Sequence, residues 1–159
     1  MKRIFCLTII LLMGYTFCFA QSTGFGMGIV LGEPTGLNFK LWLGGPSALD
    51  LGLAWAFFEP NTNTLQVYAD YLFHFLDLFK LPANAGRLVL YFGAGGRILV
   101  FNTEGNLPLS LGVRIPVGLT YFIPNVPMDV FLEIVPIMAL LPATAFQASA
   151  GLGVRFFFQ

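Results

Sequence analysis

Large apolar residues alternate with small or polar ones through most of this chain, and this period of two limits what it can fold into. The pattern is clearest between residues 49 and 57, where Leu49, Leu51, Leu53, Trp55 and Phe57 are separated by Asp50, Gly52, Ala54 and Ala56. Because successive residues of a β-strand point to opposite faces, each such strand has one apolar face and one small or polar face. The sequence therefore predicts an all-β chain.

Charged residues are too scarce to cover the outside of a soluble protein of this size. They make up 10% of the 159 residues, and hydrophobic residues make up 57%, whereas about 25% of a typical soluble domain is charged. A single short chain also has little room for a very large core. We therefore expect the apolar faces of the strands to face lipid. The net charge of zero offers no basic surface for nucleic acid.

The first twenty residues have the pattern of a cleavable secretory signal. Lys2 and Arg3 precede an apolar run over residues 4–13, and Cys18-Phe19-Ala20 places small residues at the third and first positions before a cut. We expect residues 1–20 to be the signal peptide and residues 21–159 to be one mature domain. An uncleaved membrane helix is the alternative, and the shortness of the apolar run disfavours it.

Both cysteines of the chain, Cys6 and Cys18, fall in this leader segment. The mature domain therefore has no disulfide, which fits an exported envelope protein that needs none. A lipid anchor on Cys18 is a further alternative, disfavoured by the bulky Phe17 before it.

Membrane helices are disfavoured in the mature domain. The longest stretch without charge, residues 134–154, contains Pro136, Pro142, Gly151 and Gly153, and internal proline breaks helices. Only helices and closed β-barrels satisfy all backbone hydrogen bonds within lipid. The remaining fold is a closed barrel.

Turn-forming glycine, proline and asparagine residues divide the domain into eight expected strands. Their ranges are 24–31, 37–43, 48–58, 65–76, 88–101, 111–122, 128–138 and 146–158. An even number lets both chain ends meet on one side, as in bacterial single-chain barrels. The predicted fold is a closed, antiparallel, eight-stranded, up-and-down transmembrane β-barrel.

The same alternation predicts that every charged residue within a strand faces the barrel interior. The set has four basic members and four acidic ones: Lys40, Arg97, Arg114, Arg155, Asp50, Asp70, Asp129 and Glu133. Side chains fill the interior of an eight-stranded barrel, where unpaired charge is costly. Equal numbers permit a closed set of ion pairs, so these residues are the predicted lumen charge network. Inward glycines would leave room for them.

With its leader, eight short strands and closing segment 149–158, the chain resembles small bacterial outer-membrane β-barrels, including the transmembrane domain of outer-membrane protein A. In that family the last strand reads polar-x-Gly-x-x-aromatic-x-aromatic and is recognised by the barrel assembly machinery. Gly151, Gly153, Phe156 and Phe158 fit this assembly signal, with Gly151 in place of the polar residue and Gln159 after the last aromatic. The resemblance implies a location in the bacterial outer membrane, with no specific activity.

Catalytic constellations are not evident. Some resembling barrels deacylate lipid A with a His-x-Ser pair, but the one histidine here reads His74-Phe75-Leu76. Asp70 shares its face, but four residues along a strand is about 13 Å, beyond hydrogen-bond reach. Ser149 is expected near the opposite end of the barrel from His74. No metal-ligand spacing or phosphate-binding glycine loop occurs, so we expect no cofactor and no metal.

The interpretation that we favour is a non-catalytic outer-membrane barrel with a structural or envelope-associated role and a filled lumen. A narrow pore or small-molecule binder using the polar lumen is the alternative, and a lipid-modifying enzyme comes third. The expected partners are outer-membrane lipid and, during insertion, the assembly machinery. Nucleic acid is not an expected partner, and a monomer is the expected state.

The assignment of faces generates a first prediction. Leu51→Arg places a charge on the lipid face near the middle of a strand and should destabilise the barrel by about 2–4 kcal/mol. Gly52→Ser, one residue along but inside the lumen, should cost less unless it crowds a neighbour. A refolding titration compares the two, and a reversed order would mean that every face is assigned one residue out of register.

Overall fold

The computed structural model describes residues 24–33, 35–56, 63–82, 84–102 and 109–158, so the expected signal peptide lies outside the described residues. Nine strand segments make up the fold: β1 (Phe25–Glu33), β2 (Thr35–Gly44), β3 (Ser47–Ala56), β4 (Asn63–Phe75), β5 (Arg87–Asn102), β6 (Leu109–Arg114), β7 (Val117–Phe122), β8 (Met128–Leu141) and β9 (Ala145–Phe158). Within these ranges no helix is long and apolar enough to cross a membrane.

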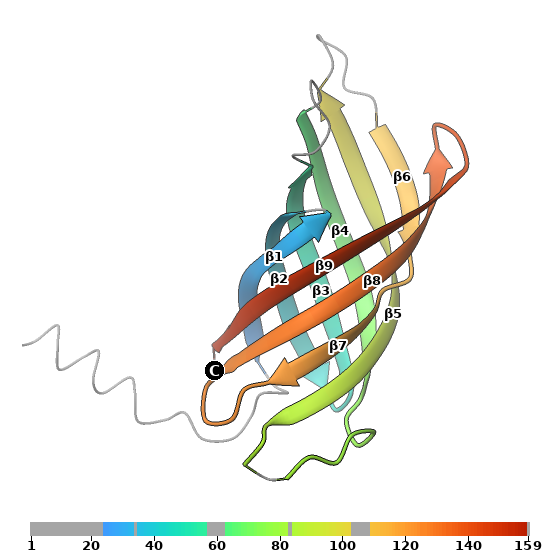
Figure 1. The fold of residues 1–159 in the computed structure, drawn as a ribbon. Coiled ribbons are helices and arrows are strands. Elements are labelled where there is room, and N and C mark those ends of the chain that lie inside the picture. Colours follow the sequence, from blue (N-terminus) through green and yellow to red (C-terminus); the bar gives the residue numbers. More distant parts are fainter. Residues whose placement is uncertain (1–23, 34, 57–62, 83, 103–108, 159) are drawn as a thin grey trace, which may run out of the picture.

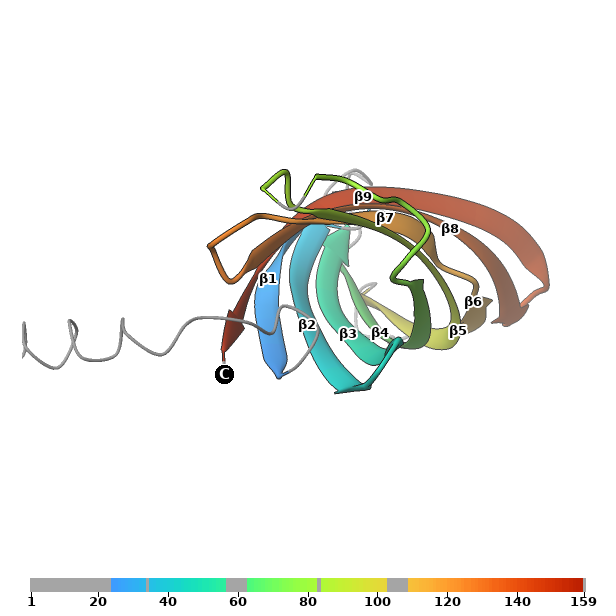
Figure 2. The same cartoon turned by 90° about the horizontal axis from the view of Figure 1, so that it is seen from below.

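The segments close into a ring of eight antiparallel strands (Figures 1 and 2). β6 and β7 together form one interrupted strand, because both pair with β5 on one side and with β8 on the other. The expected strand over residues 111–122 is therefore present but divided at Ile115-Pro116, where proline has no N–H to donate to the ladder. β1 and β9 close the ring, from Phe25 opposite Phe158 to Glu33 opposite Ala150.

The two faces of the sheet differ as the alternation predicts. Leu51, Phe92 and Ile134 are 45%, 47% and 57% exposed on the outer face, and the outer surface as a whole is apolar. All eight charged residues predicted to face inward are buried. A closed barrel with an apolar exterior and a polar interior has the architecture of a transmembrane β-barrel.

Aromatic side chains cluster on the outer face near the end of the barrel where Phe25 and Phe158 meet, here called the terminal end. Phe73, Phe75 and Phe92 lie within 6.1 Å of one another, measured between ring centroids, and the Phe25 and Phe158 rings are 6.3 Å apart. Such a girdle is typical of a barrel at the membrane interface. The opposite end, which carries the β1–β2 and β8–β9 connections, is called the loop end.

The connection between β8 and β9 differs from the sequence-based expectation. β8 continues to Leu141, so the expected connection over residues 139–145 is shortened to three residues. After β4, which ends close to the expected residue, the chain forms turns and irregular structure, and Leu78, Phe79 and Leu81 are exposed at the terminal end. Lys80 and Pro82 lie in the same segment, and Pro46 lies in the turn between β2 and β3 at the same end of the barrel.

The structure also shows that Gly52→Ser is a poor control for Leu51→Arg. Gly52 lies opposite Tyr68 on β4, and a Cβ atom at Gly52 would overlap the Tyr68 ring. A better match is Leu43→Arg, which is outward and 50% exposed at the terminal end of β2. Because the cost of arginine on the lipid face falls to about 0–1 kcal/mol near the interface, Leu43→Arg should leave the unfolding midpoint in urea nearly unchanged. Equal losses in the two variants would contradict the assigned depth of Leu51.

Candidate functional site in the lumen

Three stacks of the same kind, here called layers, lie in the lumen. In each layer an aromatic ring lies opposite a glycine on the neighbouring strand, and a cation lies over the ring. The ring–glycine pairs are Tyr68 with Gly52, Phe131 with Gly153, and Tyr91 with Gly118. The cations over these rings are Arg114 at 3.9 Å, Arg155 at 4.0 Å and Lys40 at 5.1 Å from the ring centroids. A Cβ on any of the three glycines would collide with its ring, so the absent side chains make room for the stacks.

Arg155 binds two of the four buried carboxylates. Its Nε and Nη2 donate to the two oxygens of Asp129 at 2.9 and 3.1 Å, and its Nη1 donates to Asp50 at 3.0 Å. Charge-assisted, two-point contacts of this kind are stronger than single neutral hydrogen bonds. Gly28, opposite Arg155 on β1, gives the side chain its room.

Arg114 binds the other two carboxylates. Its Nε lies 3.0 Å from Asp70 Oδ2, and its Nη2 lies 3.6 Å from Glu133 Oε1. Glu133 also accepts a hydrogen bond of 2.8 Å from the Tyr91 hydroxyl. Two of the predicted network cations therefore hold all four of the predicted acids.

Asn38 links these two clusters. Its side-chain nitrogen donates to Asp50 at 2.7 Å and to the Tyr68 hydroxyl at 3.1 Å, and its oxygen accepts from Arg155 Nη1 at 3.2 Å. Tyr68 in turn lies under Arg114. Alternation alone places Asn38 and Tyr68 in the lumen, but nothing in the sequence indicates that they join the clusters.

Lys40 has no carboxylate within 4 Å among the described residues. Its Nζ lies 2.7 Å from His74 Nε2 and over the rings of Trp42 and Tyr91. His74 Nδ1 lies 2.9 Å from the Pro46 carbonyl oxygen. An N–H must face that carbonyl, so Nδ1 carries the proton and Nε2 accepts from the lysine. Cation–π contacts and one neutral acceptor thus stand in for an ion pair.

Arg97 is the second of the four network cations that has no carboxylate within 4 Å among the described residues. It donates to the amide oxygens of Gln66 and Gln147, and its Nε has no hydrogen-bond partner. Its place opposite Gly112 puts it nearer the loop end than Arg114, which lies opposite Gly95. The structure therefore brings six of the eight predicted residues into two ion clusters and leaves Lys40 and Arg97 outside them.

Apolar side chains close the lumen at the terminal end. The group, here called the plug, consists of the buried residues Trp42, Ala48, Val89, Phe122 and Phe157, with Leu76 packed against it. Arg87 lies over the Phe122 ring, 4.8 Å from its centroid. The sequence signal for the plug is a large apolar residue at an inward position near the terminal end of a strand, as at Trp42, Phe122 and Phe157.

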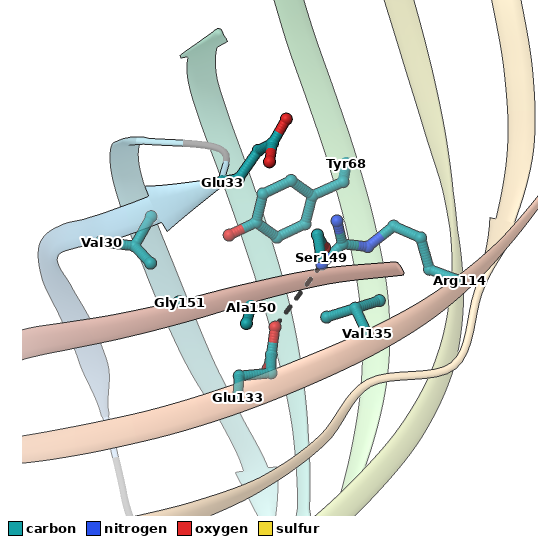
Figure 3. A pocket seen from close by; sticks show the side chains of 9 residues that line it. All are labelled: Val30, Glu33, Tyr68, Arg114, Glu133, Val135, Ser149, Ala150 and Gly151. Carbon is teal, nitrogen blue, oxygen red and sulfur yellow. Dashed lines mark ion pairs between the residues drawn. The ribbon is translucent and has the colours of Figure 1, made fainter. Parts of the chain in front are cut away.

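A small pocket opens at the loop end (Figure 3). It is lined by Val30 and Glu33 of β1, Tyr68, Arg114, Glu133 and Val135, and Ser149, Ala150 and Gly151 of β9. Together with the open solvent at its mouth it encloses about 260 Å³. One guanidinium nitrogen of Arg114, Nη1, has no hydrogen-bond partner.

The residues of the predicted assembly signal lie along β9, on both faces. Phe156 and Phe158 point outward with ring centroids 5.1 Å apart. Gly153 supports the Phe131 ring, and Gly151 lines the loop-end pocket. Recognition of these residues by assembly machinery stays a prediction.

These features define the class of small eight-stranded transmembrane barrels with a filled, polar lumen. The N-terminal β-barrel domain of Pseudomonas aeruginosa OprF has this fold, with a TM-score of 0.59 and 17% identity over 84% of this chain and 95% of that chain. Neisserial surface protein A (NspA) is also similar, with a TM-score of 0.50 and 11% identity over 84% of this chain and 93% of that one. No family profile and no curated protein sequence matches the chain. The predicted fold and the resemblance to eight-stranded outer-membrane barrels are confirmed.

The Arg155 cluster generates a second prediction. Asp129→Asn should destabilise the barrel by about 3–5 kcal/mol, because it weakens the two-point contact of a buried arginine. Asp129→Asn combined with Arg155→Met should cost less than the two single changes added together, by about 0.5–3 kcal/mol. Asp77→Asn, at an exposed aspartate, is the control and should change stability by less than about 0.5 kcal/mol. Strictly additive free energies of unfolding would show that the pair does not couple.

Proposed function

We propose that this chain is a non-catalytic barrel of the bacterial outer membrane with a structural or envelope-associated role. The filled lumen carries this proposal, because the space that a channel would need is taken by side chains that contact one another. On this proposal residues 1–20 direct export, the terminal end faces the periplasm, and outer-membrane lipid is the main partner. The assembly machinery would act during insertion, and the working form would be a monomer without a cofactor.

The plug is the specific argument against a pore. Ala48, Val89, Phe122 and Phe157 have no exposed surface at the terminal end of the lumen. An ion leaving the charged middle of the barrel in that direction would enter an apolar layer, which is costly without a compensating partner. The structure thus supports a closed lumen more than the alternative of a narrow pore.

The positions of His74 and Ser149 argue against hydrolysis. Both ring nitrogens of His74 are engaged, by Lys40 and by the Pro46 carbonyl, beside the plug. Ser149 lines the pocket at the loop end. A nucleophile and its base must lie within hydrogen-bond reach, and this pair occupies opposite ends of the barrel. A lipid-modifying enzyme is therefore poorly supported.

A small-molecule binder has one observation in its favour. Gln66 Nε2, Arg97 Nε and Arg114 Nη1 are buried donors without protein partners in the loop half of the lumen. Buried donors are normally satisfied, so this half of the lumen would accept water or another small acceptor.

A third prediction separates the closed barrel from the pore. Glu133→Gln should lower the thermal unfolding midpoint, because Arg114 loses one of its two acids, and should leave the planar-bilayer current near zero. A double variant, Trp42→Ala with Phe122→Ala, should raise the current by thinning the plug, which shows that the assay detects an open lumen. Steady current through the unaltered protein, changed in selectivity by Glu133→Gln, would favour the pore and reject the closed barrel.

A further inference from the structure

The barrel wall is short along β1 and β2. These strands have 9 and 10 residues, whereas β4, β5, β8 and β9 have 13, 16, 14 and 14. Figure 1 shows the β8–β9 hairpin and β5 reaching well beyond the arrowhead of β1. At the ring closure Glu33 is the last residue of β1 to pair with β9, opposite Ala150. Residues 145–149 of β9 pair with β8 and with no other described strand. We call this point the β1–β9 step.

The apolar outer face differs in height around the barrel in the same way. On β1 the outward apolar residues run from Phe25 to Leu31, and on β8 from Val130 to Leu140. These runs correspond to about 20 Å and about 34 Å of strand. With strands tilted about 40°, only the longer run covers an apolar layer about 25 Å tall. If the layer is set by β8, the end of β1 lies within the membrane, near the level where acyl chains join their head groups.

The pocket described above opens at the β1–β9 step. Val30, Val135, Ala150 and Gly151 give it an apolar side. Arg114 gives it one donor, Nη1, on a side chain that is 2% exposed and has its other contacts with Asp70, Glu133 and the Tyr68 ring. Figure 3 shows the Arg114 side chain among the residues that line the pocket, with its ion pair to Glu133 marked.

The charges around the pocket select the kind of acceptor that Arg114 Nη1 would take. Glu33 and Glu133 line the same pocket, so a phosphate or free carboxylate would meet two like charges. A neutral oxygen on an apolar chain is not repelled by these two carboxylates. The ester or amide carbonyl of a membrane lipid has this chemistry and lies at this depth.

We propose that the pocket at the β1–β9 step binds the acyl carbonyl of an outer-leaflet lipid, with Arg114 Nη1 as the donor and the first carbons of the chain against Val30, Val135 and Ala150. The inference rests on the proposed membrane location and adds a ligand to it. It assigns a role to the pocket at the β1–β9 step, which a purely structural barrel does not require.

The test compares two lipids that differ only in the carbonyl. The protein is refolded into phosphatidylethanolamine carrying ester-linked chains or into its diether analogue, extracted in mild detergent, and examined by native mass spectrometry for retained lipid. Because a hydrogen bond from a charged donor is stronger than one between neutral groups, ester lipid should be retained about tenfold better or more. Equal retention of the two lipids would overturn the assignment of the carbonyl.

Two variants test whether the lipid binds in this pocket. Ser149→Phe fills the pocket and should abolish the preference for ester lipid. Ala145→Phe lies on the same face of the same strand, four residues nearer the tip, and should keep it. A preference that survives Ser149→Phe, or is lost equally in Ala145→Phe, would overturn the site.

Membrane insertion is monitored separately, by heat-modifiable migration on a gel. Failure of the unaltered protein to insert would count against the proposed membrane location. Insertion without lipid preference would leave that location standing and reject the lipid site.

Discussion

The narrowness of the lumen governs the rest of this structure. An eight-stranded barrel has an interior that side chains must fill, and here the filling includes four cations and four carboxylates. Glycines opposite the bulky rings make the filling possible, as at Gly52 beneath Tyr68 and Gly153 beneath Phe131. The rings then form platforms on which Arg114 and Arg155 lie. The room left by the glycines, the stacking of arginines on rings and the ion pairs of those arginines therefore depend on one another.

Three of the four lumen cations are stabilised in two different ways, and Arg97 donates to amide oxygens. Arg114 and Arg155 each hold two acids. Lys40 has aromatic rings and His74 around it instead. In the first arrangement, neutralising one acid lowers stability but leaves the arginine with its other acid. The second places a cation beside the apolar plug without adding a carboxylate to that end of the barrel.

The sequence predicts the fold and the facing of each residue well, because alternation at a period of two reports directly which side of a strand a residue occupies. Depth along the strands also indicates Glu133 and Asp70 as the acids beside Arg114 and Arg97, and both lie on Arg114, but depth does not tell which arginine they pair with. Arg97 and Arg114 both face the lumen from adjacent strands, yet of the two only Arg114 lies within 4 Å of described carboxylates. Ion pairing depends on the register and depth of strands that are distant in sequence. The break at Pro116 and the irregular segment after Phe75 also depend on backbone details that hydropathy does not report.

Closure of the ring by β1 and β9 has a consequence for how the barrel forms. Phe25 pairs with Phe158, so the contact that completes the structure joins positions near opposite ends of the described chain. Contacts of such long range form slowly, because the loop-closure entropy is lost before the contact contributes. Until then both outermost strands have unpaired edges, which are sites of aggregation in water and unstable in lipid. The polypeptide must therefore be protected until its last strand is in place.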